Sequence, residues 1–387
     1  MSNFDKLTIR RNTNSIKWSG EENELPMWVA DMDFEAPVSV REALVKRAEH
    51  GIYGYCDIPE EWNEAIANWR LKRYNHLIDK NDLLYCTSVV GAISSIVRKI
   101  TSVGENIVVQ TPVYNIFFNS ILNNGRNVLE NKLSYKDGKF EIDFADLEEK
   151  LSNKQTSLMI LCNPHNPIGY AWSKEELAKI GEMAHKYNVV VLADEIHCDL
   201  TDPGVVYTPF SSVNEVCKNI SITCSSPTKT FNLAGLHTSY IYISNSYLKH
   251  KVWRGINTDE VAEANIFAVE GAIAAYTYGE GWLEELREYL YKNKQEFIFE
   301  VEKEVPVKVI RGNATYLLWV DCSNICDDAN ELVEFIKKET GLRVTAGDVY
   351  RSSTPFIRVN IACPNERMKD GINRFILGVK KYLSKTE

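Results

Sequence analysis

The chain has 387 residues, of which 44% are hydrophobic and 25% are charged, and its formal net charge is −9. These proportions are typical of a globular protein, and the acidic balance argues against nucleic acid or an anionic membrane as a partner. Because the length exceeds what one compact core usually holds, we expect two domains.

Targeting and metal signals are weak along the whole sequence. No apolar run approaches the roughly twenty residues that cross a bilayer, and residues 1–6 lack the basic start and apolar core of a signal peptide. The nine cysteines are scattered, and no Cys or His spacing matches a zinc site. We therefore expect a cytoplasmic protein with free, buried thiols and no structural metal.

Helices and strands alternate in the pattern of apolar residues after an extended arm at 1–40. Helices are predicted at 41–50, 60–74, 92–103, 114–123, 173–187, 281–304, 330–339 and 365–383. Strands are predicted at 106–110, 126–132, 157–162, 189–194, 238–243, 307–310, 315–321 and 356–361. This order predicts an α/β fold with a mostly parallel sheet. The helix at 281–304 would join a large domain, 41–280, to a smaller α/β domain, 281–387, to which the arm would also belong.

Two predicted strands end in polar residues that suit a ligand site. The strand at 157–162 runs into the turn Asn-Pro-His-Asn-Pro-Ile-Gly at 163–169, and the strand at 189–194 ends in Asp194. Ligands of open α/β sheets bind at the carboxyl ends of the strands. Taken alone, the asparagines of the turn are explained equally well by turn geometry.

Lys229 lies among hydroxyl residues in Ser-Ser-Pro-Thr-Lys-Thr-Phe-Asn at 225–232, thirty-five positions after Asp194. A pyridoxal phosphate site needs these groups: an amine for the cofactor aldehyde, hydroxyls for its phosphate and a carboxylate that keeps its ring nitrogen protonated. By itself the lysine proves little, since most lysines in such surroundings are solvated loop residues.

The motifs in this order resemble the fold-type I pyridoxal phosphate enzymes, aminotransferase class I/II. They are Asn-Pro-x-Asn-Pro-x-Gly at 163–169, Asp-Glu-Ile-His at 194–197, Ser-x-x-Lys-Thr-Phe-Asn at 226–232 and Arg-Val-Asn at 358–360. Further blocks at 27–34, 53–55, 229–236 and 358–364 are similar to the MalY/PatB-type branch of cystathionine β-lyases. The blocks span nearly the whole chain, and the resemblance implies a pyridoxal 5'-phosphate-dependent transferase-like large domain.

The resemblance also implies roles around the cofactor ring. Lys229 would attach the cofactor covalently and then remove the α-proton of the substrate. Asp194 would pair with the ring nitrogen, Asn166 would hydrogen-bond the ring oxygen, and Tyr114 would stack on the ring. His197 either lies near the ring oxygen or is an ordinary histidine of the core or a helix start.

A second group of residues would bind the cofactor phosphate. Ser226, Thr228 and the backbone N–H groups of Val90 and Gly91 are implied, the last two at the start of a helix, where unpaired donors favour an anion. Tyr55 would reach across a dimer interface to the phosphate of the neighbouring site, which implies a homodimer with shared active sites.

Arg358 would bind the substrate α-carboxylate, because a planar guanidinium forms bidentate pairs with carboxylates. The backbone at Ala30 would complete this site, and a structural ion pair is the alternative reading of Arg358. Two positions depart from the family pattern. His237 stands where many aminotransferases carry a phosphate-binding arginine, and Ile168 stands where threonine is typical.

The branch resemblance implies β-elimination from L-cystathionine or a cysteine S-conjugate, which yields pyruvate, ammonia and a thiol. An aminotransferase would use the same Lys229, Asp194 and Arg358, so it remains the alternative. A further alternative is a regulatory protein that acts through a protein partner. No basic helix-turn-helix is appended to the chain, which disfavours direct DNA binding.

Overall fold

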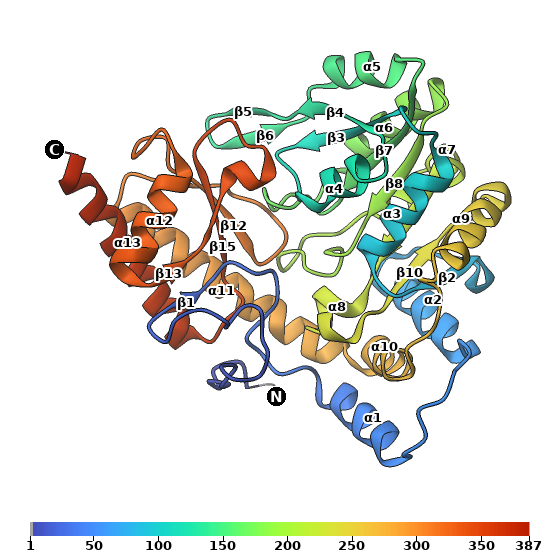
Figure 1. Cartoon of the computed structure of the whole chain (residues 1–387), viewed down its shortest axis with the longest axis horizontal. Coiled ribbons are helices and arrows are strands. Elements are labelled where there is room, and N and C mark those ends of the chain that lie inside the picture. The colour runs from blue at the N-terminus through green and yellow to red at the C-terminus, as the bar shows by residue number, and fades with distance from the viewer. Residues whose placement is uncertain (1–2, 387) are drawn as a thin grey trace.

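A seven-stranded sheet forms the centre of the computed structural model, which describes residues 3–386 (Figure 1). Its strand order is β2-β10-β9-β8-β7-β3-β4, and every pair is parallel except the two made by β10. The strands are β2 (Leu83–Cys86), β3 (Asn106–Thr111), β4 (Asn127–Lys132), β7 (Thr156–Cys162), β8 (Val190–Asp194), β9 (Ser221–Ser225) and β10 (Ser239–Tyr242). This mixed, mostly parallel sheet confirms the predicted α/β class.

Helices cover both faces of this sheet (Figure 1). One face packs against α3 (Val89–Ile100), α4 (Ile116–Leu122) and α9 (Ser246–Thr258), and the other against α5 (Phe144–Ser152), α6 (Lys174–Lys186) and α7 (Glu215–Ile220). Strand β7 shows the consequence. Leu158 and Ile160 join the core on the α3 side, whereas Met159 and Leu161 join the core on the α6 side. Its sequence is therefore continuously apolar, as buried parallel strands are.

A smaller antiparallel sheet follows in the C-terminal part of the chain. Its order is β11-β12-β15-β14, made of β11 (Lys308–Val309), β12 (Leu317–Asp321), β15 (Phe356–Asn360) and β14 (Thr345–Ala346). The helices α11 (Glu280–Glu304), α12 (Ala329–Thr340) and α13 (Asn365–Thr386) accompany it, and Figure 1 shows α11 leading from the region of α10 to this sheet. The exact division into domains stays a prediction.

The N-terminal arm is tied to the C-terminal part of the chain. Its short strand β1 (Leu25–Pro26) pairs in parallel with β13 (Leu342–Arg343). The backbone N–H of Asn360 donates to Met27 O at 2.8 Å. The arm then crosses toward α8 (Pro227–Thr230), where the N–H of Met32 donates to Asn232 Oδ1 at 3.0 Å. Residues 27–34 thereby lie between the small sheet and Lys229.

Three further helices pack beside the large sheet: α1 (Val38–Glu49), α2 (Glu60–Tyr74) and α10 (Ile266–Tyr278). Sequence reading missed α10 because seven of its residues are buried and apolar residues occur on most of its sides, which removes the usual 3.6-residue signal. It also missed β2, β9, α5, α7, α9 and the hairpin of β5 (Ser134–Lys136) with β6 (Lys139–Glu141). The capping box of Ser173 and Glu176 at the start of α6 is confirmed.

The start of α3 corrects one predicted boundary. The helix begins at Val89, three residues before the predicted start at residue 92, and Ser88 caps it by accepting a hydrogen bond from the N–H of Gly91 at 2.9 Å. Two valines and a glycine are poor helix formers, so their pattern hid the first turn. The cap supplies what their propensity lacks.

Three findings concern membrane-spanning helices, cysteines and metal ligands. Within residues 3–386 no helix is long and apolar enough to cross a bilayer. All nine cysteines are free thiols, and all are buried except Cys56 and Cys326, which are partly exposed. The described part of the chain holds no group of three or more His, Cys, Asp or Glu side chains that is suited to a metal ion.

Candidate active site

A cavity of about 240 Å³ opens at the carboxyl ends of the central strands. Strands β7 and β8 end side by side, with Cys162 opposite Asp194 in the register, and β9 leads directly into α8 and Lys229. The cavity wall consists of Ala30, Thr87, Ser88, Val89, Val90, Tyr114, Cys162, Asn166, Asp194, Ile196, His197, Thr228, Lys229, Ala234, His237 and Thr238. Eight of the predicted site residues thus meet there: Ala30, Val90, Tyr114, Asn166, Asp194, His197, Thr228 and Lys229.

Asp194 is the carboxylate of this cavity, and its charged form is poorly compensated. The residue is 4% exposed, and burial raises the pKa of its carboxyl to about 7, with Glu195 adding to the effect. A hydrogen bond from the N–H of Ile196 at 3.1 Å and the charge of Lys229 act in the opposite direction. A nearby cation would therefore stabilise its charged form.

Lys229 lies on the short helix α8 and faces the arm. Its Nζ donates a hydrogen bond to the carbonyl oxygen of Ala30 at 2.6 Å. Burial lowers the pKa of this amine to about 8, with Arg358 also lowering it, while Asp31 and Asp194 oppose the shift. An amine with this pKa is partly neutral near pH 8, which is the state required of a nucleophile or a base.

His197 is buried in the same wall. Its Nδ1 has no hydrogen-bond partner among residues 3–386, and its ring meets Tyr316 edge-on at a centroid distance of 6.1 Å. Burial lowers the pKa of the imidazole to about 3, and the charges of Lys229 and Arg358 contribute to the same shift. The ring is therefore neutral at physiological pH and can offer a hydrogen bond to a ligand, which supports the binding role among the two alternatives.

Arg358 projects from β15 toward the turn after β7. It is 5% exposed; its Nη2 donates to Trp28 O at 2.8 Å and its Nη1 to Asn166 Oδ1 at 3.2 Å. The ring of Tyr350 lies 4.9 Å from the guanidinium carbon, and Nε has no partner in the described chain. No ion pair found within residues 3–386 includes Arg358, so the structural ion pair is not what holds it. A buried guanidinium without a counterion favours an anionic ligand.

Of the residues predicted to bind the cofactor phosphate, two line the cavity and two lie behind its wall. Val90 and Thr228 line the cavity next to Ser88, at the N-terminus of the twelve-residue helix α3. Gly91 and Ser226 lie behind the wall, where the Gly91 N–H donates to Ser88 and the Ser226 hydroxyl donates to Thr238 O at 2.5 Å.

The two positions that depart from the family pattern differ in their surroundings. His237 lies in the cavity wall, close to the groups that could hold a phosphate. Ile168 is 1% exposed and packs in the hydrophobic core between the sheet and α6. Only the histidine is therefore placed to affect a ligand directly.

Tyr55 is not part of the cavity within the single chain. It is fully exposed in the loop between α1 and α2, together with the exposed Ile52 and Tyr53, and it does not line the cavity. Its predicted role depends on a second subunit and stays a prediction.

Three features of the site were not predicted from the sequence. Thr87 and Ser88 line the cavity, and the cap at Ser88 would have indicated them had the helix start been placed correctly. Tyr316 is buried and its hydroxyl donates to Ala30 O at 3.1 Å, but no local pattern marks it. Asn360 binds the arm carbonyls of Val29 and Asp31 at 2.5 and 2.7 Å, contacts that span more than 300 residues.

The polar groups in and around the cavity fit pyridoxal phosphate. Asp194 has the raised carboxyl pKa that a protonated ring nitrogen would lower, and Lys229 has a partly neutral amine for the aldehyde. The unpartnered His197 Nδ1 and the N-terminus of α3 offer sites for the polar substituents. Arg358 remains for the carboxylate of an amino acid.

Comparison with known proteins agrees with this geometry. The sequence model of the family "Aminotransferase class I and II" matches residues 25–375. The chain is 40% identical to cystathionine beta-lyase PatB of Bacillus subtilis (strain 168) over 96% of this chain and 98% of that protein. It is 28% identical to protein MalY of Escherichia coli (strain K12), over 98% and 99% of the two chains.

A solved structure gives the same result for the fold. The PLP-bound C-S lyase from Staphylococcus hominis superposes with a TM-score of 0.92 at 33% sequence identity, covering 98% of each chain. The family match and the relative at 40% identity each extend over nearly the whole chain. This chain therefore belongs to the aminotransferase class I and II family, in its MalY/PatB-type branch.

Proposed function

We propose that this protein is a pyridoxal phosphate-dependent carbon–sulfur β-lyase. It cleaves L-cystathionine or a cysteine S-conjugate to pyruvate, ammonia and a thiol. The observation that carries the proposal is one cavity lined by both Lys229, with its lowered pKa, and Asp194, with its raised pKa. Arg358, which has no counterion within residues 3–386, contacts the wall residue Asn166. The cystathionine beta-lyase named among the relatives, at 40% identity, supports the choice of reaction.

The residues of the wall would hold the cofactor in a defined orientation. Lys229 would bind it covalently, Asp194 would face the ring nitrogen, and Asn166 and His197 would meet the ring oxygen. Tyr114 would stack on the ring, and its own hydroxyl stays neutral because burial raises its pKa to about 12. The phosphate would meet Val90 and Ser88 at the start of α3, with Thr228 and His237 beside them. Gly91 and Ser226 would support this site from behind.

The bound cofactor withdraws electrons from the substrate Cα, which makes the proton on that carbon removable. Arg358 holds the substrate carboxylate, and the arm at Ala30 closes the site over it. The amine of Lys229 takes the proton from Cα and keeps it close to the sulfur that departs from Cβ. Because the groups are buried, water is largely excluded from this transfer.

We also propose a homodimer in which Tyr55 of one subunit reaches the phosphate in the site of the other. The exposed Ile52, Tyr53 and Tyr55 form an apolar loop on one chain, which supports burial by a second copy. The free thiols suit the reducing cytoplasm. Light scattering tests the dimer, and a fully active monomer would contradict it.

The lyase is tested by supplying L-cystathionine without a keto-acid acceptor. A β-lyase regenerates its starting form in each cycle, so pyruvate and free thiol should accumulate through many turnovers. An aminotransferase would stop after one turnover until a keto acid is added, and that result would replace the lyase by the alternative. The Lys229→Ala variant, which lacks the base, is the negative control. A protein that binds the cofactor but turns over neither way would favour the regulatory alternative.

A further inference from the structure

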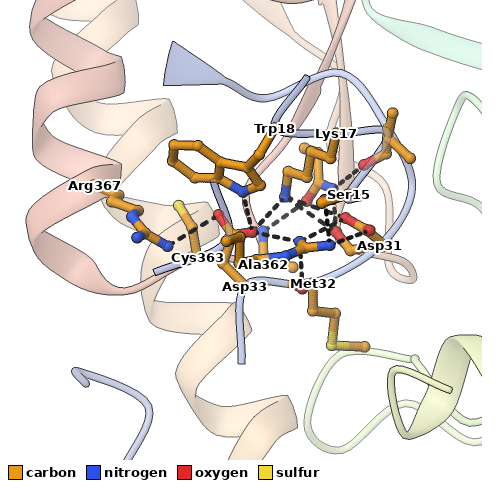
Figure 2. Close-up of polar contacts among 12 residues, drawn as sticks. Ser15, Lys17, Trp18, Asp31, Met32, Asp33, Ala362, Cys363 and Arg367 are labelled. Atoms are coloured by element: carbon orange, nitrogen blue, oxygen red, sulfur yellow. Dashed lines mark hydrogen bonds and ion pairs between the residues drawn. The ribbon is translucent and has the colours of Figure 1, made fainter. Parts of the chain in front are cut away.

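A cluster of paired charges joins the arm to α13, and Figure 2 shows its polar contacts. None of its residues lines the cavity. We call it the arm cluster, and it consists of Arg10, Lys17, Trp18, Asp31, Asp33 and Arg367. Asp33 is its centre. One oxygen, Oδ1, lies 2.7 Å from Arg10 Nη1, 3.3 Å from Lys17 Nζ and 3.0 Å from Trp18 Nε1. The other, Oδ2, lies 3.5 Å from Arg367 Nη1.

The arm cluster is costly to bury unless its charges are paired. The side chains of Lys17 and Asp33 are each only 1% exposed. Burial alone would raise the pKa of the Asp33 carboxyl, but Lys17, Trp18 and Arg10 together hold it below its usual value. The arm is also anchored separately, because β1 pairs with β13. A simple tether therefore does not require this concentration of charge.

The arm backbone at residues 28–30 also contacts the proposed active-site residues. Trp28 O accepts from Arg358 Nη2 at 2.8 Å, and Ala30 O accepts from Lys229 Nζ at 2.6 Å. Tyr316 donates to the same Ala30 oxygen at 3.1 Å. The arm backbone thus directly contacts the two side chains proposed to hold and activate the substrate.

The arm cluster and the catalytic contacts are linked through the backbone between them. Arg10 Nη1 bonds both Asp33 and Met32 O, the latter at 3.0 Å. Lys17 Nζ bonds Asp31 O at 3.2 Å while it pairs with Asp33. The carbonyl groups of Asp31 and Met32, which follow Ala30, therefore bind Lys17 and Arg10, and both of these cations pair with Asp33.

We propose that Asp33 is a positioning residue for the active site. Through Arg10 and Lys17 it fixes residues 28–32, so that the Ala30 carbonyl orients the Lys229 amine and the Trp28 carbonyl orients the Arg358 guanidinium. The proposal rests on the proposed function only in taking an amino acid as the ligand. No hydrogen bond or ion pair found within residues 3–386 joins the Asp33 side chain to a wall residue of the cavity, so its effect is indirect.

The test uses the full-length holoenzyme with Asp33→Asn, which keeps the shape of the side chain and removes its charge. We expect the KM for L-cystathionine, and the Kd for L-alanine read from cofactor absorbance, to rise about ten-fold or more, since small misplacements near a reacting group have such effects. The fall in kcat should be smaller, and cofactor affinity should stay within about two-fold because Asn166, Asp194 and Lys229 hold it. Hydrogen exchange should increase in peptides covering 27–34.

The matched control is Glu35→Gln, two positions along the same segment. Within residues 3–386 the ion pairs of Glu35 are with Lys6 and Arg41 at the surface, so its variant should match the wild type in KM, Kd and exchange. If Asp33→Asn fails to fold, Trp18→Phe removes one hydrogen bond to Asp33 and leaves every charge, with an expected rise in KM of about two- to five-fold.

Asp33 would be merely structural if the exchange in 27–34 increased while KM and the Kd for L-alanine stayed unchanged. Unchanged exchange together with unchanged KM would also overturn the proposal. Failure of the lyase function is distinguishable, because it would appear as a wild type that releases no pyruvate. The Kd for L-alanine would still test Asp33 in that case, since a lyase and an aminotransferase both bind the carboxylate of an amino acid.

Discussion

Two buried aspartates of this chain have opposite electrostatics. Asp33 in the arm and Asp194 at the end of β8 are 2% and 4% exposed. Asp33 is surrounded by Arg10, Lys17 and Trp18, and the pKa of its carboxyl lies below the usual value. The carboxylate of Asp194 accepts one hydrogen bond, from the N–H of Ile196, among the described residues, and burial raises its pKa to about 7.

The difference shows that burial alone does not determine the role of a charged side chain. The partners of Asp33 are all supplied by the chain, so this residue is suited to fixing the fold of the arm. Asp194 is left under-paired in a cavity beside an amine, so its charge is available to a ligand. Perturbed pKa values of this kind gather at functional sites.

The largest effect is expected when the charge of Asp194 is removed. Asp194→Asn should lower kcat for L-cystathionine by about 10³-fold or more. The variant would leave the protonated ring nitrogen of the cofactor buried without a counterion, which costs several kcal/mol. KM should change much less, since the carboxylate acts on the cofactor ring and not on the substrate carboxylate. Steady-state pyruvate release measures both parameters. An Asp194→Asn variant that keeps more than about a tenth of the wild-type kcat would disprove the role of Asp194.

Removal of Arg358 should come next. Arg358→Ala should lower kcat/KM by about 30- to 5,000-fold, because losing a buried, hydrogen-bonded charge pair costs about 2–5 kcal/mol. The same assay measures it. The control is Arg311→Ala at the surface pair with Glu302, which should stay within about two-fold of the wild type. Equal losses in the two variants would show that Arg358 acts only through stability.

A smaller effect concerns the amine of Lys229 in the cofactor-free protein. Cofactor attachment needs the neutral amine, and with a pKa of about 8 the association rate should rise about ten-fold from pH 7 to pH 9 and then level off. Stopped-flow absorbance would follow this rate. A rise of about a hundred-fold without a plateau would indicate an ordinary lysine, with no effect of burial.

Much of the cavity was predictable because its residues follow local signals. Asn166 lies in a turn marked by two prolines, and Asp194 ends a short apolar strand, so both could be placed at one edge of a parallel sheet. Lys229 needed the resemblance as well, since hydroxyl neighbours alone do not distinguish it from a loop lysine. The alternation of strands and helices was enough to predict the α/β class.

The rest depended on contacts between distant parts of the chain. Asn360 and Arg358 hold the arm across more than 300 residues, and neither contact has a period or a spacing that a sequence shows. The arm cluster likewise unites Arg10, Asp33 and Arg367, whose charges look like ordinary solvated residues in the sequence. Ser88 was missed for a local reason, because the valines and glycine after it concealed the helix start.

The contrast between the two aspartates predicts opposite effects of pH on stability. The folded pKa of Asp194 lies above its unfolded value of about 3.8, so its burial costs stability increasingly as pH rises from about 4 to about 7, and fully above that. The folded pKa of Asp33 lies below its unfolded value, so its contribution is present above about pH 4 and is lost as pH falls through the folded pKa. At pH 8 both carboxyls are charged.

The most direct test is therefore the free energy of unfolding of the cofactor-free protein at pH 8, measured by urea denaturation. Asp194→Asn should raise it by about 1–2 kcal/mol, because the variant relieves a buried, under-paired charge. Asp33→Asn should lower it by about 3 kcal/mol, because the variant leaves the buried Lys17 short of a counterion. Opposite signs would support the assignment of Asp194 to the ligand and of Asp33 to the arm. A loss of stability in both variants would contradict it.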